Sequence, residues 1–238
     1  MTGVKAREQA IAGRAWLCAG VAALGPVAAF LLMVGSQAGV IDRRLAFQEL
    51  VLPWGVWLAL AAVAAALFAG LFALRAPRAA WLPAVIALVL AAGSAGGFGW
   101  ARQAFAEQGA LDVTTNPADR PGFSRAILDR RAAAGGVDPG TLPQAGAACD
   151  LGGSVPTQVA PETAAWALRQ AGFEVLGFGV GRADGVKQDR AFGFGHDAVV
   201  RIRPGQTDVR VVAREAWRDG GAACRLARKI VQGLTASE

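Results

Sequence analysis

The sequence predicts three transmembrane α-helices followed by an α+β domain, in which an antiparallel four-stranded sheet carries helices on one face. Three long runs without a charged residue lie in the first hundred residues. In the second half, apolar and polar residues alternate over several short segments, as in half-buried strands. An amphipathic helix follows them. We therefore divide the chain into an anchor (1–100), a Pro/Gly-rich extension (101–160) that wraps or tethers the domain, and an exported domain (161–238).

The three charge-free runs cover residues 15–34, 51–74 and 80–99. Each is long enough to cross the hydrocarbon core of a bilayer, which needs about 20 apolar residues. The hydrophobic share of 54% and the mean hydropathy of +0.37 are too high for an ordinary soluble enzyme. Tryptophans, which favour the membrane interface, lie near the ends of the runs: Trp16, Trp54, Trp57, Trp81 and Trp100. The lipid bilayer is the first partner that the sequence predicts.

The distribution of basic residues near the helix ends predicts the orientation. One side of the membrane receives Lys5, Arg7, Arg14, Arg75 and Arg78, and the other receives only Arg43, Arg44 and Arg102. Basic residues favour the cytoplasmic side. The amino terminus is therefore expected in the cytoplasm and, after three crossings, the carboxy-terminal domain in the periplasm of a bacterial inner-membrane protein.

The third run ends in small residues that include a GxxxG spacing, Gly93 and Gly97. Such a spacing allows helices to approach closely in the membrane. Two partners for this surface stay open: the other two spans of the same chain, or another membrane subunit.

The soluble half predicts short elements in order. Ser124 suits the cap of a helix over 124–134, and a helix over 161–171 precedes the sheet. An Asp-Gly turn at 182–185 separates two strands, and a turn at 204–207 separates the other two. The expected strands cover 173–180, 186–194, 196–203 and 208–215, and the last helix covers 217–234.

The last two strands are expected to place charged residues on one face of the sheet. If Arg203 lies opposite Asp208, Arg201 faces Arg210 and Asp197 faces Arg214. Two arginines facing each other are unfavourable unless an anion joins them. The arginine face is therefore either an ordinary solvated surface of ion pairs or an open site for a partner or a small anion. Its members are Arg201, Arg203, Arg210, Arg214, Asp197 and Asp208.

Two motifs of this half resemble a bacterial and plastid family catalogued as domain of unknown function fourteen-ninety-nine. The first combines FGF, HDAVVRIRP and TDVR with Arg214, Asp219 and Gly221, and the second is DVTTNPADRPGF at 112–123. The chain departs from the family at His196, where an acidic residue is usual, and at Val211 and Ala213, where serines are usual. The resemblance implies a shared α+β fold and a family without an assigned biochemistry.

The chain has three cysteines. Cys18 lies inside the first run and is expected to be a packing residue. Cys149 and Cys224 are either a disulfide, if the domain is in an oxidising compartment, or two separate thiols.

The residue types argue for binding rather than catalysis. His196 is the single histidine and falls on the core-facing side of its strand, and no cofactor or metal motif is present. From Arg102 onward, 17 basic residues stand against 15 acidic ones, so the net charge of +6 is no sign of a nucleic-acid surface. We expect an accessory or scaffold protein whose exported domain docks a membrane-protein partner. The alternative is a binding module for an anionic ligand, such as a lipid headgroup or carboxylate, and an enzyme is the least favoured reading.

Overall fold

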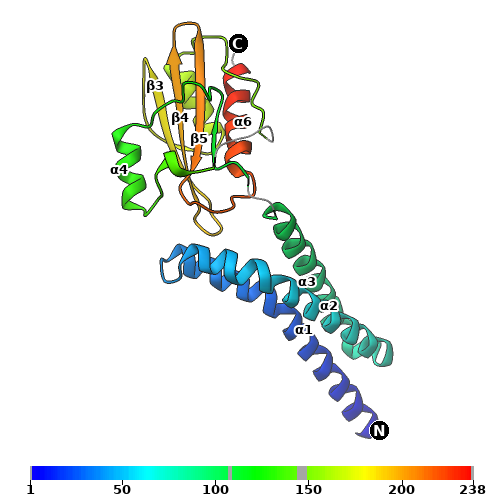
Figure 1. Cartoon of the computed structure of the whole chain (residues 1–238). Helices are drawn as coiled ribbons and strands as arrows, with labels where there is room; N and C mark the ends of the chain where they lie inside the picture. Colours follow the sequence, from blue (N-terminus) through cyan, green and yellow to red (C-terminus); the bar gives the residue numbers. More distant parts are fainter. Residues whose placement is uncertain (1, 107–108, 144–148, 237–238) are drawn as a thin grey trace. The chain divides into compact units, whose positions relative to one another are not determined.

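The computed structural model describes residues 2–106, 109–143 and 149–236. The chain divides into two compact units, Met1–Gln103 and Ala104–Glu238. Figure 1 shows the first as a set of long helices and the second as a sheet flanked by helices.

The first unit contains the long apolar helices that the sequence predicts. Within the described residues, three helical segments are long and apolar enough to cross a membrane. They are α1 (Thr2–Gln37), a continuous span formed by the π-helical η1 (Leu45–Val51) and α2 (Leu52–Arg75), and α3 (Pro77–Ala104). The predicted runs 15–34, 51–74 and 80–99 all lie inside these segments.

Small residues fill the interior of this unit and large apolar residues point outward. Leu17, Leu67 and Leu88 are 72%, 68% and 62% exposed, an arrangement that suits a lipid environment rather than water. The buried cluster between the helices consists of alanines: Ala19, Ala22, Ala62, Ala65, Ala69, Ala87 and Ala91.

The second unit is built on an antiparallel sheet of five strands in the order β1-β5-β4-β3-β2. The expectation of four strands is wrong because the extension contributes the edge strand β1. The strands are β1 (Asp112–Thr114), β2 (Glu174–Gly179), β3 (Arg182–Gln188), β4 (Gly195–Arg203) and β5 (Gln206–Ala213). The α+β class is confirmed.

Helices cover both faces of the sheet, whereas one face had been predicted to stay open (Figure 1). On one face, α5 (Pro161–Gln170) and α6 (Ala222–Thr235) enclose the main core with Val200, Val209 and Val211. On the other face lies α4 (Arg125–Ala133), whose Arg131 binds Asp197 of β4. A short 3-10 helix, η2 (Pro139–Thr141), follows α4.

The helices α4 and α5 begin close to the predicted positions, and the Ser124 side chain accepts a hydrogen bond from the Ile127 amide as expected for a cap. The last helix starts at Ala222 instead of Trp217. Gly220 and Gly221 both have positive φ, which ends the preceding segment, and the Asp219 carboxylate accepts the amide of Ala223. Its predicted apolar side is buried against the sheet at Ala223, Leu226, Ala227, Ile230 and Leu234.

Both hairpin turns differ from the prediction. Val180 and Gly181 join β2 to β3, so the Asp-Gly pair predicted as the turn lies inside β3. Gly185 is needed there because an added Cβ would come within 3.0 Å of Phe173. Between β4 and β5 the turn has two residues, Pro204 and Gly205, instead of the four predicted.

Candidate functional site

The short turn between β4 and β5 shifts the predicted register by two residues. Arg201 lies opposite Asp208, and Arg210 lies opposite Val199. Asp197 pairs with Val212. A shift of two keeps every side chain on its predicted face, but the predicted pairing of Arg201 with Arg210 is wrong. Between β4 and β5 no two arginines lie opposite each other. Arg201 does lie opposite Arg182 of β3, but Asp184 binds Arg182 and Asp208 binds Arg201.

Asp208 is the centre of one buried polar cluster on this face. Its side chain is 0% exposed and binds Arg201 and Arg203, each at 2.8 Å. Burial raises the pKa of Asp208, but hydrogen bonds from Ser154, Arg201, Gln206 and Asn116 outweigh it and hold the pKa below its usual value. The half-exposed Asp119, from the extension, binds the same two arginines at 3.0 and 2.8 Å.

The remaining members of the arginine face have internal partners as well. Arg210 forms a two-pronged ion pair with Asp112 of β1, with both N–O distances at 2.9 Å. Asp197 accepts Arg214 on one oxygen at 2.7 Å and Arg131 of α4 on the other at 2.9 Å. The carboxylates that join these arginines are thus supplied by the protein itself.

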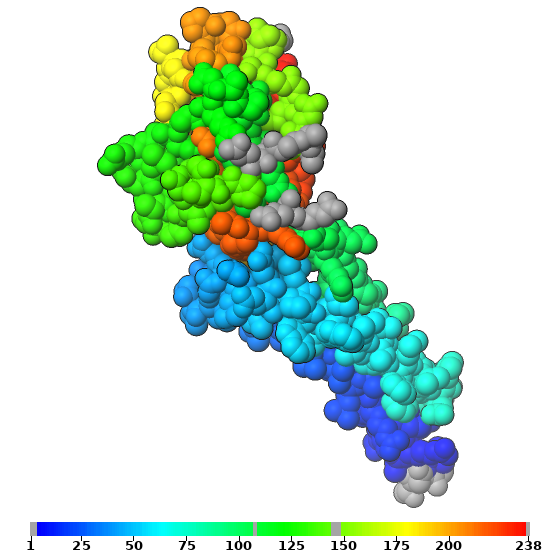
Figure 2. All heavy atoms as spheres, in the orientation of Figure 1, coloured from blue at the N-terminus to red at the C-terminus, as the bar shows by residue number. Residues whose placement is uncertain are grey.

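The extension covers this face. Figure 2 shows the residues after 109, in green, spread over the orange strands. Asp197 and Asp208 are completely buried, and Arg210 is 8% exposed. The arginine face is not left open as predicted: its two aspartates are buried, and all four arginines form ion pairs with carboxylates of the protein itself.

The structure joins Cys149 to Cys224 by a disulfide, with the two Cα atoms 5.9 Å apart. The bridge ties the end of the extension to α6 and packs beside the main core. The thiol of Cys18 in α1 is free.

His196 is buried and contacts Asp219, with 3.3 Å between Nε2 and the carboxylate. Burial raises the pKa of Asp219, but His196 and the amides of Ala223 and Gly221 lower it below its usual value. Because Asp219 also caps α6, the pair holds the start of this helix against β4. The described residues contain no group of three His, Cys, Asp or Glu side chains that could hold a metal ion.

Among the described residues, nothing packs closely on the glycines of the GxxxG spacing. Apart from the backbone of α3 itself and the adjacent residues, an added Cβ at Gly93 or at Gly97 would meet no atom within 4 Å. The buried side of α3 carries Ala87, Ala91 and Ser94 instead. The glycine surface is therefore not explained by packing among the described parts of the three spans.

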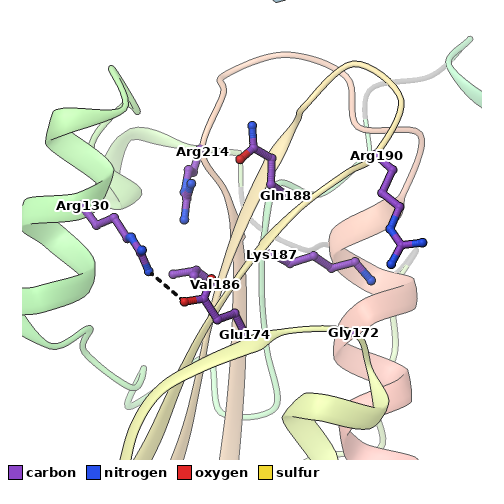
Figure 3. A pocket seen from close by; sticks show the side chains of 8 residues that line it. All are labelled: Arg130, Gly172, Glu174, Val186, Lys187, Gln188, Arg190 and Arg214. Carbon is purple, nitrogen blue, oxygen red and sulfur yellow. Dashed lines mark ion pairs between the residues drawn. The ribbon is translucent and has the colours of Figure 1, made fainter. Parts of the chain in front are cut away.

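A basic pocket lies at another edge of the sheet (Figure 3), with a volume of about 370 Å³. Four cationic side chains and one carboxylate line it, with contributions from α4, the start of β2 and the end of β3. The residues are Arg130, Gly172, Glu174, Val186, Lys187, Gln188, Arg190 and Arg214. Figure 3 shows Arg130 reaching from α4 toward Glu174, while Arg190 lies beside α6.

The single carboxylate of the pocket is held weakly. Glu174 is 70% exposed and lies 3.7 Å from Arg130, which itself is 48% exposed. An exposed ion pair of this kind contributes about 0–1 kcal/mol. An incoming anion can therefore displace Glu174 from Arg130 at little cost.

Two glycines leave space for cationic side chains of the pocket. Lys187 donates to the carbonyl of Ala171 at 2.8 Å, and a Cβ on Gly172, which has φ +87°, would come within 2.7 Å of its Nζ. A Cβ on Gly195 would collide with the Arg214 side chain. Burial lowers the pKa of Lys187, with Lys229 adding to the effect and Asp189 opposing it. A bound anion would instead raise the pKa of Lys187.

Comparison of the chain with known protein families, with curated proteins and with solved structures finds no match.

Proposed function

We propose that the chain is a membrane-anchored accessory protein whose α+β domain acts by binding, and that it recognises an anionic group in the basic pocket. The observation that carries this proposal is the pocket lining: four cationic side chains, of which Arg214 is paired with Asp197, line the pocket together with one weakly held carboxylate. Guanidinium groups bind carboxylates and phosphates through two parallel hydrogen bonds, and an ammonium adds a point charge. The site predicted between Arg201 and Arg210 is not retained.

We further propose that the domain lies in the periplasm of a bacterial inner-membrane protein, with the amino terminus in the cytoplasm. The excess of basic residues at the amino terminus and after the second span supports this orientation. The disulfide between Cys149 and Cys224 also supports it, since such bonds persist in oxidising compartments.

Anion binding should raise the thermal stability of the full chain in a non-ionic detergent. A ligand at ten times its Kd stabilises the folded state by about 1.4 kcal/mol, so inorganic phosphate should raise the Tm by roughly 3–5 °C over chloride at equal ionic strength. The double variant Lys187→Gln, Arg190→Gln should lose this shift.

The matched control removes the same charge elsewhere. Arg125 pairs with Asp129 on the surface of α4, and Arg169 lies over the Phe178 ring. The double variant Arg125→Gln, Arg169→Gln should keep the full response to phosphate. Equal responses in all three proteins, or none in the native chain, would rule out the pocket as an anion site.

A second candidate function is docking to another membrane subunit through the glycine surface of α3, which the free space at Gly93 and Gly97 favours. A subunit that co-purifies with the native chain should be lost when both glycines are replaced by leucine. Gly70→Leu in α2 is the control, because an added Cβ there also meets nothing within 4 Å. Retention of the subunit by the α3 variant would contradict this docking mode.

A further inference from the structure

The basic pocket lies at the end of the sheet where the chain arrives from α3. Across the sheet, Lys187 pairs with His196 and His196 pairs with Ala213, so β3 and β5 finish at the same end. Beyond β5, Arg218 donates to the carbonyls of Phe105 and Ala106 at 3.2 and 2.8 Å. These two residues directly follow α3.

The chain enters this end of the domain only a few residues after the third apolar run. Trp100 marks the interfacial end of the third apolar run, and Phe105 is only five positions further along the chain. Even a fully extended chain of that length spans no more than about 18 Å. The opposite end of the sheet, with the Pro204-Gly205 turn, has no such tether.

Three aromatic side chains lie at the same end of the sheet, two of them just after the pocket residue Arg190 in the sequence. The segment between β3 and β4 carries Phe192 and Phe194, which stack with their centroids 6.0 Å apart. Trp217 meets Phe194 edge-on at 4.2 Å. All three are partly exposed. Aromatic rings with one side in an apolar environment and the other exposed to solvent are favoured at the level of lipid headgroups.

From these observations we propose that the anionic group bound by the pocket is the phosphate of an anionic membrane lipid, a proposal that rests on the function proposed above. The phosphodiester of such a lipid carries a full negative charge on two exposed oxygens, and both can accept hydrogen bonds from the cationic side chains that line the pocket. The aromatic residues would lie in the interfacial zone while the cations hold the headgroup. The pocket would thereby orient the domain on its own membrane.

Native mass spectrometry of the full chain in a non-ionic detergent tests the proposal, with phosphatidylglycerol and phosphatidylcholine added in separate arms. The native chain should retain phosphatidylglycerol in preference to phosphatidylcholine. The Lys187→Gln, Arg190→Gln variant should bind phosphatidylglycerol about 25-fold more weakly, since each basic residue near an anionic lipid contributes a factor of about five. The Arg125→Gln, Arg169→Gln control should bind like the native chain.

Comparing the response to inorganic phosphate with the binding of lipid distinguishes the lipid proposal from the anion-binding proposal on which it rests. Suppose that phosphate stabilises the native chain. If the native chain then binds both lipids equally, or if the pocket variant binds phosphatidylglycerol as well as the native chain does, the lipid assignment is overturned and the anion site stands. If neither the binding of phosphate nor the binding of phosphatidylglycerol depends on Lys187 and Arg190, both proposals fail. Arg130→Gln, on a different element, provides a second pocket variant and should also weaken phosphatidylglycerol binding.

Discussion

Replacing Asp208 by alanine is expected to destabilise the α+β domain by about 3 kcal/mol, because it removes the acceptor of a buried ion pair. The side chain is 0% exposed, and Arg201 and Arg203 both donate to it. Ser154, Asn116 and Gln206 would lose their acceptor as well. The measurement is thermal or denaturant unfolding of the full chain in detergent, followed by near-ultraviolet signals of the domain.

Asp119→Ala is the matched control, since Asp119 binds the same two arginines but is 57% exposed. The Asp119→Ala variant should lose much less stability than the Asp208→Ala variant.

The pH dependence of stability gives a second check. The folded pKa of Asp208 lies below its unfolded value, so its contribution is present above that unfolded value and disappears as the pH falls through the folded pKa. The Asp208→Ala protein should therefore lose less stability on acidification than the native chain. Equal losses in the Asp208 and Asp119 variants would contradict the buried cluster.

Removal of the disulfide should have an effect of similar size. The bond between Cys149 and Cys224 closes a loop with a sequence separation of 75, and the chain-entropy model assigns such a loop roughly 4 kcal/mol. The double variant Cys149→Ser, Cys224→Ser should lower the Tm by roughly 8–16 °C. Reducing agent should lower the Tm of the native chain in the same way.

The free cysteine supplies the control for that experiment. Cys18→Ser in α1 should leave the Tm of the domain and its response to reducing agent unchanged. A native chain that is indifferent to reducing agent, or that shows two reactive thiols before reduction, would contradict the bridge.

The membrane-spanning helices could be predicted because the absence of charge over about 20 residues is a local signal that burial in lipid requires. Local signals also predicted the start of α4, where Ser124 caps the helix, and the apolar side of α6. The faces of β4 and β5 were also predictable, since alternation fixes them whatever the register.

The cross-strand partners were not predictable from alternation alone. The number of residues in the turn at Pro204 and Gly205 decides the register, and an even shift leaves the pattern unchanged. The edge strand β1 has only three residues and depends on pairing with β5, whose Arg210 binds Asp112. Such a contact, 98 residues apart, leaves no local signal.

The pocket was missed because β3 ends earlier than its apolar pattern indicates. The carboxylate of Asp189 accepts the amides of Ala191, Phe192 and Phe194, and this turns the chain away from the sheet. Lys187 and Arg190 then line the same pocket as Arg130 from α4, a combination that no spacing in the sequence predicts.

Chemical modification of lysines tests the central claim, anion binding in the basic pocket, most directly. The chain has three lysines, and Lys5, in the amino-terminal helix, serves as the internal reference for Lys187. Lys229 is not used as a reference because its charge acts on Lys187. The account predicts that saturating inorganic phosphate, at constant ionic strength, slows acetylation of Lys187 by about threefold or more while Lys5 reacts as before. An unchanged rate at Lys187, or an equal slowing at Lys187 and Lys5, would contradict it.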